Sequence, residues 1–199
     1  MYWLRRGRSR ARSALIEVVT TVGLAVAIFL PVTTFGAQTV YVEQHSMIDT
    51  LQPGQQMLVD KLTPRFDPYS RGDIIVFHVD GDADTVPLIK RVIGLGGEHV
   101  AIRSGSVWID GRRLAEPYTY ADRATGLNEP TEPTTDVWQW DVPEHHLFVL
   151  GDHRQGSTDS RMRSVDMVDI DDVVGRVVFR YFPLSELGPL WTPEYPELR

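Results

Sequence analysis

Residues 99–115 read HVAIRSGSVWIDGRRLA, and this stretch points to the fold class. Apolar and polar residues alternate on both sides of Asp110-Gly111, a dipeptide that favours the two-residue turn of a β-hairpin. Beyond residue 38 no amphipathic helical pattern exceeds about ten residues. Short β-rich runs bounded by Gly or Pro also occur at residues 39–43, 56–62, 72–79, 87–95, 146–152 and 172–182. The sequence therefore predicts a mostly β fold.

The segment that follows the hairpin has a different composition. Residues 116–146 are rich in Pro, Thr and Glu and show little periodicity, so we expect a long excursion between strands. No internal repeat or linker divides residues 38–199. These residues are therefore expected to form a single domain.

The first 37 residues carry the pattern of a membrane anchor. Residues 1–13 contain five arginines and no acidic residue, and Val18–Phe35 is 18 residues without a charge. As a helix this run would be about 27 Å long, close to the thickness of a bilayer core. Residues 14–37 are predicted to span the lipid bilayer once, with a cytoplasmic tail before them and an extracytoplasmic domain after them. A cleaved signal peptide is the alternative, although TTFGAQ is a weak small-x-small match.

The charge of the remaining chain argues against nucleic acid as a partner. The sequence has 20 Lys and Arg against 27 Asp and Glu, and setting aside the five arginines of the tail leaves a net charge of −12. Contacts with phosphates require a basic surface, which such a domain does not offer. The absence of cysteine agrees with an extracytoplasmic domain that folds without disulfides.

One serine and one lysine are candidates for chemistry. Ser46 precedes a Pro-Gly turn, and a serine attacks a carbonyl only when a base removes its proton. None of the six histidines lies in a triad motif, and on an extended chain His45 would point away from Ser46. Lys90 shares a predicted strand face with Leu88 and Val92, where burial would lower its pKa and make it a base. The alternative is a surface lysine on an edge strand, with its stem reaching water.

Residues 151–165, GDHRQGSTDSRMRSV, are too dense in Gly, Ser, Asp and Arg to be expected in the core. They are either an ordinary loop or a source of a hydroxyl that orients an amine and of an Asp-Arg pair. No zinc, calcium or phosphate motif is present, so we expect no metal and no cofactor. Arg91 is expected to be solvated or paired on the face opposite Lys90.

Five blocks in order resemble the type I signal peptidase family of membrane-anchored serine/lysine endopeptidases. They are HSMIDTLQPGQQMLVDK (45–61), RGDIIVF (71–77), IKRVIGLGGEHV (89–100), IDGRRLAEPY (109–118) and VPEHHLFVLGDHRQGSTDSR (142–161). The resemblance covers nearly the whole chain. It implies a catalytic domain of coiled β-sheets behind one N-terminal transmembrane helix.

The resemblance also implies roles for individual residues. Ser46 would be the acylated nucleophile and Lys90 its general base. Ser157 would form a hydrogen bond with the lysine amine, and Asp159 and Arg161 would form a supporting pair.

Substrate contacts are implied in the same way. The backbone N–H of Ser46 and the side chain of Gln44 would form the oxyanion hole. Shallow pockets for small side chains would be lined by Val42, Leu51, Met57, Val76 and Ile89. The chain differs from the usual family pattern at His45, Gln44, Asp49, Gln55, Gly96, His153 and Ser164.

The implied activity is removal of signal peptides from exported preproteins after an Ala-x-Ala-type site. The preprotein segment would bind as an added β-strand and acylate Ser46. One alternative is a noncatalytic membrane-anchored homologue that binds exported segments. Another is a self-cleaving serine/lysine regulator, against which the predicted anchor argues. The sequence leaves the oligomeric state open, and also whether FPLSELGPLW (182–191) contacts lipid.

Overall fold

The structure is a computed structural model that describes residues 15–27, 36–134 and 136–198. The chain divides into two compact units, Met1–Gln38 and Thr39–Arg199. In the first unit, residues 15–27 form an α-helix. No helix among the described residues is long and apolar enough to cross a membrane. Part of the predicted anchor, residues 14 and 28–35, lies outside the described residues, as does the basic tail 1–13.

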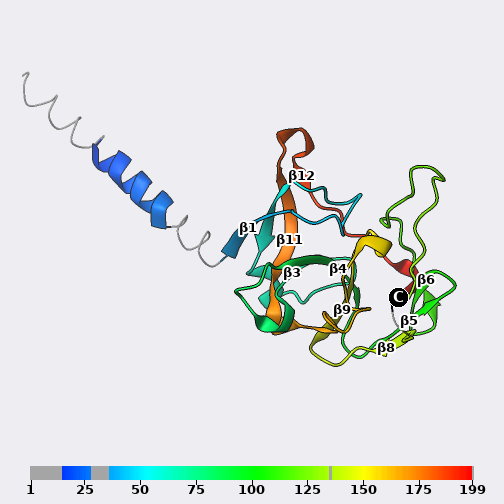
Figure 1. The fold of residues 1–199 in the computed structure, drawn as a ribbon. Helices are drawn as coiled ribbons and strands as arrows, with labels where there is room; N and C mark the ends of the chain where they lie inside the picture. The colour runs from blue at the N-terminus through cyan, green and yellow to red at the C-terminus, as the bar shows by residue number, and fades with distance from the viewer. Residues whose placement is uncertain (1–14, 28–35, 135, 199) are drawn as a thin grey trace, which may run out of the picture. The chain divides into compact units, whose positions relative to one another are not determined.

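Residues 37–189 contain two antiparallel sheets (Figure 1). The larger sheet has the order β1-β2-β11-β3-β4-β9-β10, and β12 also pairs with β11. Its strands are β1 (Ala37–Tyr41), β2 (Gln56–Asp60), β3 (Ile74–Phe77), β4 (Leu88–Gly94), β9 (His146–Leu150), β10 (Val168–Asp169), β11 (Val173–Phe182) and β12 (Gly188–Pro189). The predicted mostly β fold is confirmed.

The smaller sheet contains the hairpin that the sequence predicts. Its order is β7-β6-β5-β8, with β5 (His99–Arg103), β6 (Ser106–Ile109), β7 (Arg112–Arg113) and β8 (Gln139–Asp141). Ile109 faces Arg112 across the turn, and Asp110 and Gly111 have φ angles of 48° and 78°. Two positive φ angles are the mark of the type I′ turn, which Asp-Gly favours.

Three strands have no counterpart among the predicted runs. β8, β10 and β12 have two or three residues each, too few for alternation to be visible in the sequence. β8 lies within residues 116–146 and pairs with β5, with Val100 opposite Trp140. From β7 to β8 the described residues form turns and loops, with one isolated bridge between Ala121 and Asn128.

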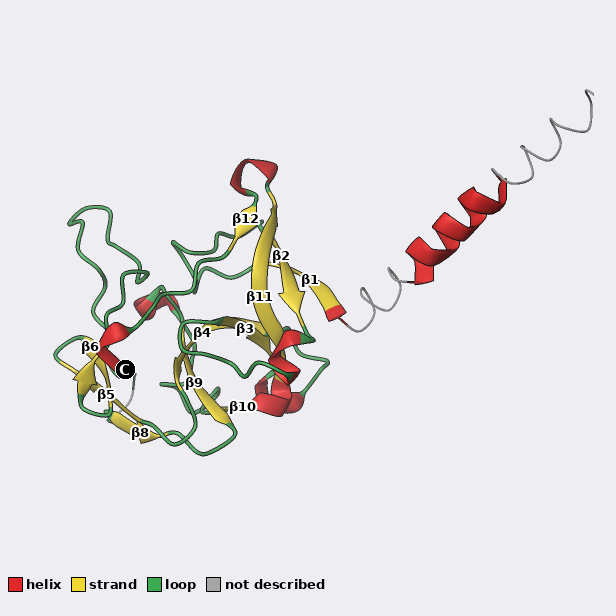
Figure 2. Cartoon of the chain, turned by 180° about the vertical axis from the view of Figure 1, so that it is seen from behind, coloured by secondary structure: helices red, strands yellow, loops and turns green. Residues whose placement is uncertain are grey.

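Strand β4 occupies the middle of the larger sheet. It lies between β3 and β9, and Figure 2 shows the same neighbours from behind. Six of its seven residues are buried, so both faces of this strand are covered. Buried apolar clusters lie around Ile93 and Phe148, around Met57 and Leu51, and around Ile75 and Val149. This central position removes Lys90 from solvent.

Candidate active site

Ser46 and Lys90 lie in contact, although 44 residues separate them in the sequence. Lys90 Nζ is 2.9 Å from Ser46 Oγ and donates a second hydrogen bond of 3.0 Å to the carbonyl of Ile89. The exposed fractions of Ser46 and Lys90 are 5% and 1%. The edge-strand alternative for Lys90 is therefore wrong, because β4 is paired on both sides. When the amine is neutral, the Ser46 hydroxyl donates to it over the same distance, which is the geometry of a nucleophile and its base.

Burial changes the protonation of this amine. Desolvation lowers the pKa of Lys90 from 10.5 to about 8, and it outweighs the carboxylates of Asp159 and Asp152, which act to raise it. At pH 7 roughly a tenth of the amine would then be neutral, against well under a thousandth for an ordinary lysine. The site thus supplies a usable base without a histidine.

The segment with Ser46 is a turn rather than the extended chain that we assumed for His45. Residues 46–50 form consecutive turns, and Leu51 N–H donates to the Met47 carbonyl over 2.7 Å. The His153 N–H donates to the Ser46 carbonyl over 3.0 Å, which joins the turn to the segment after β9.

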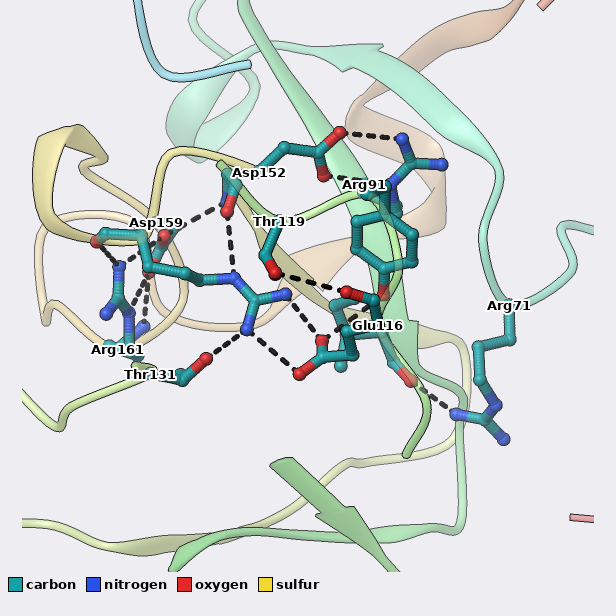
Figure 3. Close-up of polar contacts among 12 residues, drawn as sticks. Arg71, Arg91, Glu116, Thr119, Thr131, Asp152, Asp159 and Arg161 are labelled. Atoms are coloured by element: carbon teal, nitrogen blue, oxygen red, sulfur yellow. Dashed lines mark hydrogen bonds and ion pairs between the residues drawn. The ribbon is translucent and has the colours of Figure 1, made fainter. Parts of the chain in front are cut away.

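A buried ion pair joins strand β4 to the same segment after β9. Arg91 donates to both oxygens of Asp152, at 2.8 Å and 2.6 Å, and Figure 3 shows the two groups facing each other. Thr50 Oγ1 donates to Asp152 Oδ2 over 2.5 Å. Desolvation acts to lower the pKa of Arg91, but Asp152 outweighs it and the pKa is raised. Arg91 is therefore a paired charge and not a solvated one. The sequence analysis missed Thr50 and Asp152, whose partners are far away in the sequence.

The expectation that residues 151–165 lie outside the core is wrong for most of residues 151–161. Asp152, Arg154, Asp159 and Arg161 are at most 3% exposed. Each charge has a partner: Asp159 accepts hydrogen bonds from Arg161 Nε at 2.8 Å and Nη2 at 2.9 Å, and from the Gly151 N–H at 3.1 Å. The predicted Asp159–Arg161 pair is present (Figure 3). Buried charges with such partners avoid the large cost of unpaired burial.

Ser157 is close to this centre but lacks the predicted contact. Its side chain is buried, yet Ser157 Oγ has no hydrogen-bond partner among the described residues. The expected bond to Lys90 is thus absent from this structure. A Cβ at Gly151 would overlap Ser157 Oγ and lie 2.5 Å from the Ser46 carbonyl oxygen, so only glycine fits between these two serines.

The positions that differ from the family pattern near Ser46 face solvent. Gln44, His45 and Asp49 are exposed. Solvent screens a charge at such a position, so Asp49 would oppose a negative charge near Ser46 less than a buried carboxylate would.

The five residues expected to line substrate pockets lie in one apolar cluster. Their exposed fractions are between 0% and 9%, and the cluster includes Met47, the neighbour of Ser46. The five expected pocket residues are Val42, Leu51, Met57, Val76 and Ile89. The structure brings them together beside the nucleophile, and their contact with substrate stays a prediction.

Comparison with known proteins gives the family of the chain. Residues 15–182 match the family described as "Signal peptidase, peptidase S26". A signal peptidase I of Leptolyngbya laminosa is 36% identical over 193 residues, which cover 92% of this chain and 88% of the relative. A signal peptidase I of Bacillus licheniformis is 34% identical over 176 residues, with 88% and 93% covered.

A solved structure gives a further match. The crystal structure of a signal peptidase I from Enterococcus faecalis V583 is 32% identical in sequence. The match covers 55% of this chain and 97% of the other, with a TM-score of 0.40.

Proposed function

The chain belongs to the signal peptidase family, peptidase S26, and is a signal peptidase I, a serine endopeptidase; we propose that Ser46 is its nucleophile and Lys90 its general base. The observation that carries the proposal is the 2.9 Å contact between Lys90 Nζ and Ser46 Oγ, both of them buried. The lowered pKa of Lys90 supports it, because a base must be neutral to accept a proton.

In the acylation step, Ser46 Oγ attacks the carbonyl carbon before the scissile bond while its proton moves to Lys90 Nζ. The resulting ammonium then gives this proton to the departing amine, and an ester joins Ser46 to the signal peptide. Water attacks this ester with the neutral Lys90 as base, which releases the signal peptide and restores Ser46. The Ser46 N–H would stabilise the oxyanion, with the exposed Gln44 as the second donor if its amide turns inward.

The segments around Ser46 and Lys90 would hold the two side chains in position for the reaction. The Ser46 turn is fixed through His153, Thr50 and Asp152, and the carboxylate of Asp159 is directed by Arg161. Ser157 would reach the amine by a rotation of its hydroxyl-bearing side chain. The cluster of Val42, Leu51, Met57, Val76 and Ile89 would select small side chains before the cut.

The location of the enzyme is also a proposal. Five arginines before 18 uncharged residues favour one membrane span with a cytoplasmic N-terminus and an extracytoplasmic catalytic domain. The partners would then be the lipid bilayer and the signal peptides of exported preproteins.

Cleavage of a preprotein by single-residue variants tests the dyad. Ser46→Ala and Lys90→Met should each lower kcat by at least about 10³-fold, because the nucleophile and its base act together and neither works without the other. Lys61→Met, at the only other lysine of the sequence, and Ser70→Ala, at an exposed serine, are matched controls. Both controls should cleave at wild-type rates.

Retained cleavage by Lys90→Met would exclude Lys90 as the base. A wild-type chain that binds the preprotein without cutting it would instead support the noncatalytic alternative. Where cleavage occurs, sequencing the new N-terminus of the product tests the specificity, since a signal peptidase should cut after a small residue.

A further inference from the structure

Two histidines and two aspartates that the proposed chemistry does not use meet at the β9–β10 end of the larger sheet. His146 begins β9 and His145 directly precedes it, while Asp169 ends β10 and Asp171 lies just after it. Figure 2 shows β10 beside β9. The sequence shows no metal motif here, because the two histidines and the two aspartates are separated by more than 20 residues in the chain.

The backbone fixes the relative positions of these four side chains. Asp169 is directly opposite His146 in the β9–β10 ladder, and the Ile170 N–H donates to the His145 carbonyl over 3.0 Å. Asp169 Oδ1 accepts a hydrogen bond of 2.9 Å from the Asp171 N–H, which fixes the turn between the two aspartates. The ligand atoms thus lie on paired backbone rather than on independent loops.

The distances between the side-chain atoms suit a small metal ion. His145 Nε2 is 3.3 Å from Asp171 Oδ1 and 3.7 Å from Asp169 Oδ1, and one ligand atom from each of these residues lies within 4.8 Å of the others. Ligands that bind zinc tetrahedrally at about 2.0–2.2 Å are themselves about 3.3–3.6 Å apart. His146 Nε2 lies 3.9 Å from Asp169 Oδ2 and offers a fourth ligand.

Charge and access favour a cation at the same place. Two carboxylates are held close together here, and a divalent ion would remove their repulsion. The side chains of His145, Asp169 and Asp171 are 57%, 40% and 86% exposed, so an ion can reach them from solvent. Imidazole together with carboxylate suits zinc-type ions better than Ca²⁺ or Mg²⁺, which prefer oxygen ligands alone.

We propose that His145, Asp169 and Asp171 bind one divalent transition-metal ion of the zinc type, with His146 as the fourth ligand. The ion links the start of β9 to the segment after β10. Because it binds the folded chain, it stabilises the native state by mass action. The site is separate from the proposed Ser46–Lys90 chemistry, so its test does not depend on cleavage.

Zinc binding by the purified full chain tests the site. Competition with a chromophoric chelator should show one equivalent of Zn²⁺ bound with a micromolar or lower Kd, and saturating Zn²⁺ should raise Tm. His145→Ala and Asp171→Asn should each weaken Zn²⁺ binding at least tenfold and abolish the Tm increase. Mg²⁺ and Ca²⁺ should give no comparable increase.

His99→Ala is the matched control. His99 Nδ1 also lies 2.7 Å from Oδ1 of an exposed aspartate, Asp141, but no third ligand beside these two is found among the described residues. This variant should bind Zn²⁺ like the wild type. The proposal fails if wild type binds less than one equivalent, if Asp171→Asn binds normally, or if His99→Ala loses as much affinity. Asp171→Asn keeps the shape of an exposed side chain, so it decides the matter even if His145→Ala folds poorly.

Discussion

The protonation of Lys90 determines how cleavage should depend on pH. The pKa of Lys90 is lowered to about 8 by desolvation, and only the neutral amine accepts the proton of Ser46. We therefore expect kcat/KM to rise with pH through about 8, and to keep this rise when all six histidines are replaced. An acid limb near pH 6.5 that disappears with one histidine would contradict the assignment.

Arg161 provides a second test of the same group. Arg161 binds both oxygens of Asp159, whose charge acts to raise the pKa of Lys90. In Arg161→Ala this carboxylate is no longer neutralised, so the acid limb should move to higher pH. A pH–rate profile on one peptide measures the shift, and circular dichroism of the variant checks its fold. An unchanged profile in a folded variant would show that the pair does not tune Lys90.

Burial of Lys90 should also cost stability. Its folded pKa, about 8, lies below its ordinary value of 10.5, so the unfolded chain binds more protons between these two pH values and stability rises with pH across that window. Below pH 8 the full cost of the buried ammonium is present, about 3 kcal/mol at 1.4 kcal/mol per pKa unit. Lys90→Met should therefore be inactive but more stable than wild type at pH 7, with a smaller difference at pH 10. Urea unfolding at the two pH values tests this. A gain of equal size at both would point to packing rather than charge.

At the scale of structural elements, the buried Arg154 joins residues 116–131 to the segment that carries Asp159. Arg154 begins the short helix η4 (Arg154–Gly156) and pairs with Glu116 and Thr131, while its Nε donates to the Gly151 carbonyl over 3.0 Å. The side chain of Arg154 is 0% exposed and that of Glu116 is 10% exposed. Solvent therefore screens this pair little.

Arg154→Met should lower the free energy of unfolding by about 3–5 kcal/mol, because it leaves the largely desolvated carboxylate of Glu116 without its arginine partner. Arg180→Met is the matched control, since the Arg180–Glu186 pair is 20% and 47% exposed and should contribute less than about 1 kcal/mol. Chemical denaturation of both variants gives the comparison. Equal losses would mean that burial of the Arg154 pair contributes nothing of its own.

For the chain as a whole, the charge pattern predicts a defined membrane topology. Five arginines followed by 18 uncharged residues should keep the full chain with the membrane fraction. Protease added to the extracytoplasmic side should digest residues 38–199 and spare residues 1–13. An intact chain in the soluble fraction, or a tail cut from that side, would refute this topology.

The sequence alone determined the β class, the Asp110-Gly111 hairpin and, through the ordered blocks, the signal peptidase family. These features depend on side-chain alternation, turn preferences and motif order, all of which are local and visible in the chain. The residue pattern of one strand does not determine whether Lys90 is a buried base or a surface lysine. β8 and β10 were too short to show a period.

Only the tertiary structure decided which polar groups are buried and with what they pair. Lys90 is desolvated because β3 and β9 lie on either side of β4. The residue pattern of one strand does not encode this strand order. The Arg91–Asp152 pair joins residues 61 positions apart. The absence of a Ser157–Lys90 hydrogen bond likewise appears only in three dimensions. Desolvation and charge pairing are sums over neighbours from distant segments, so a linear sequence identifies the groups but not their environment.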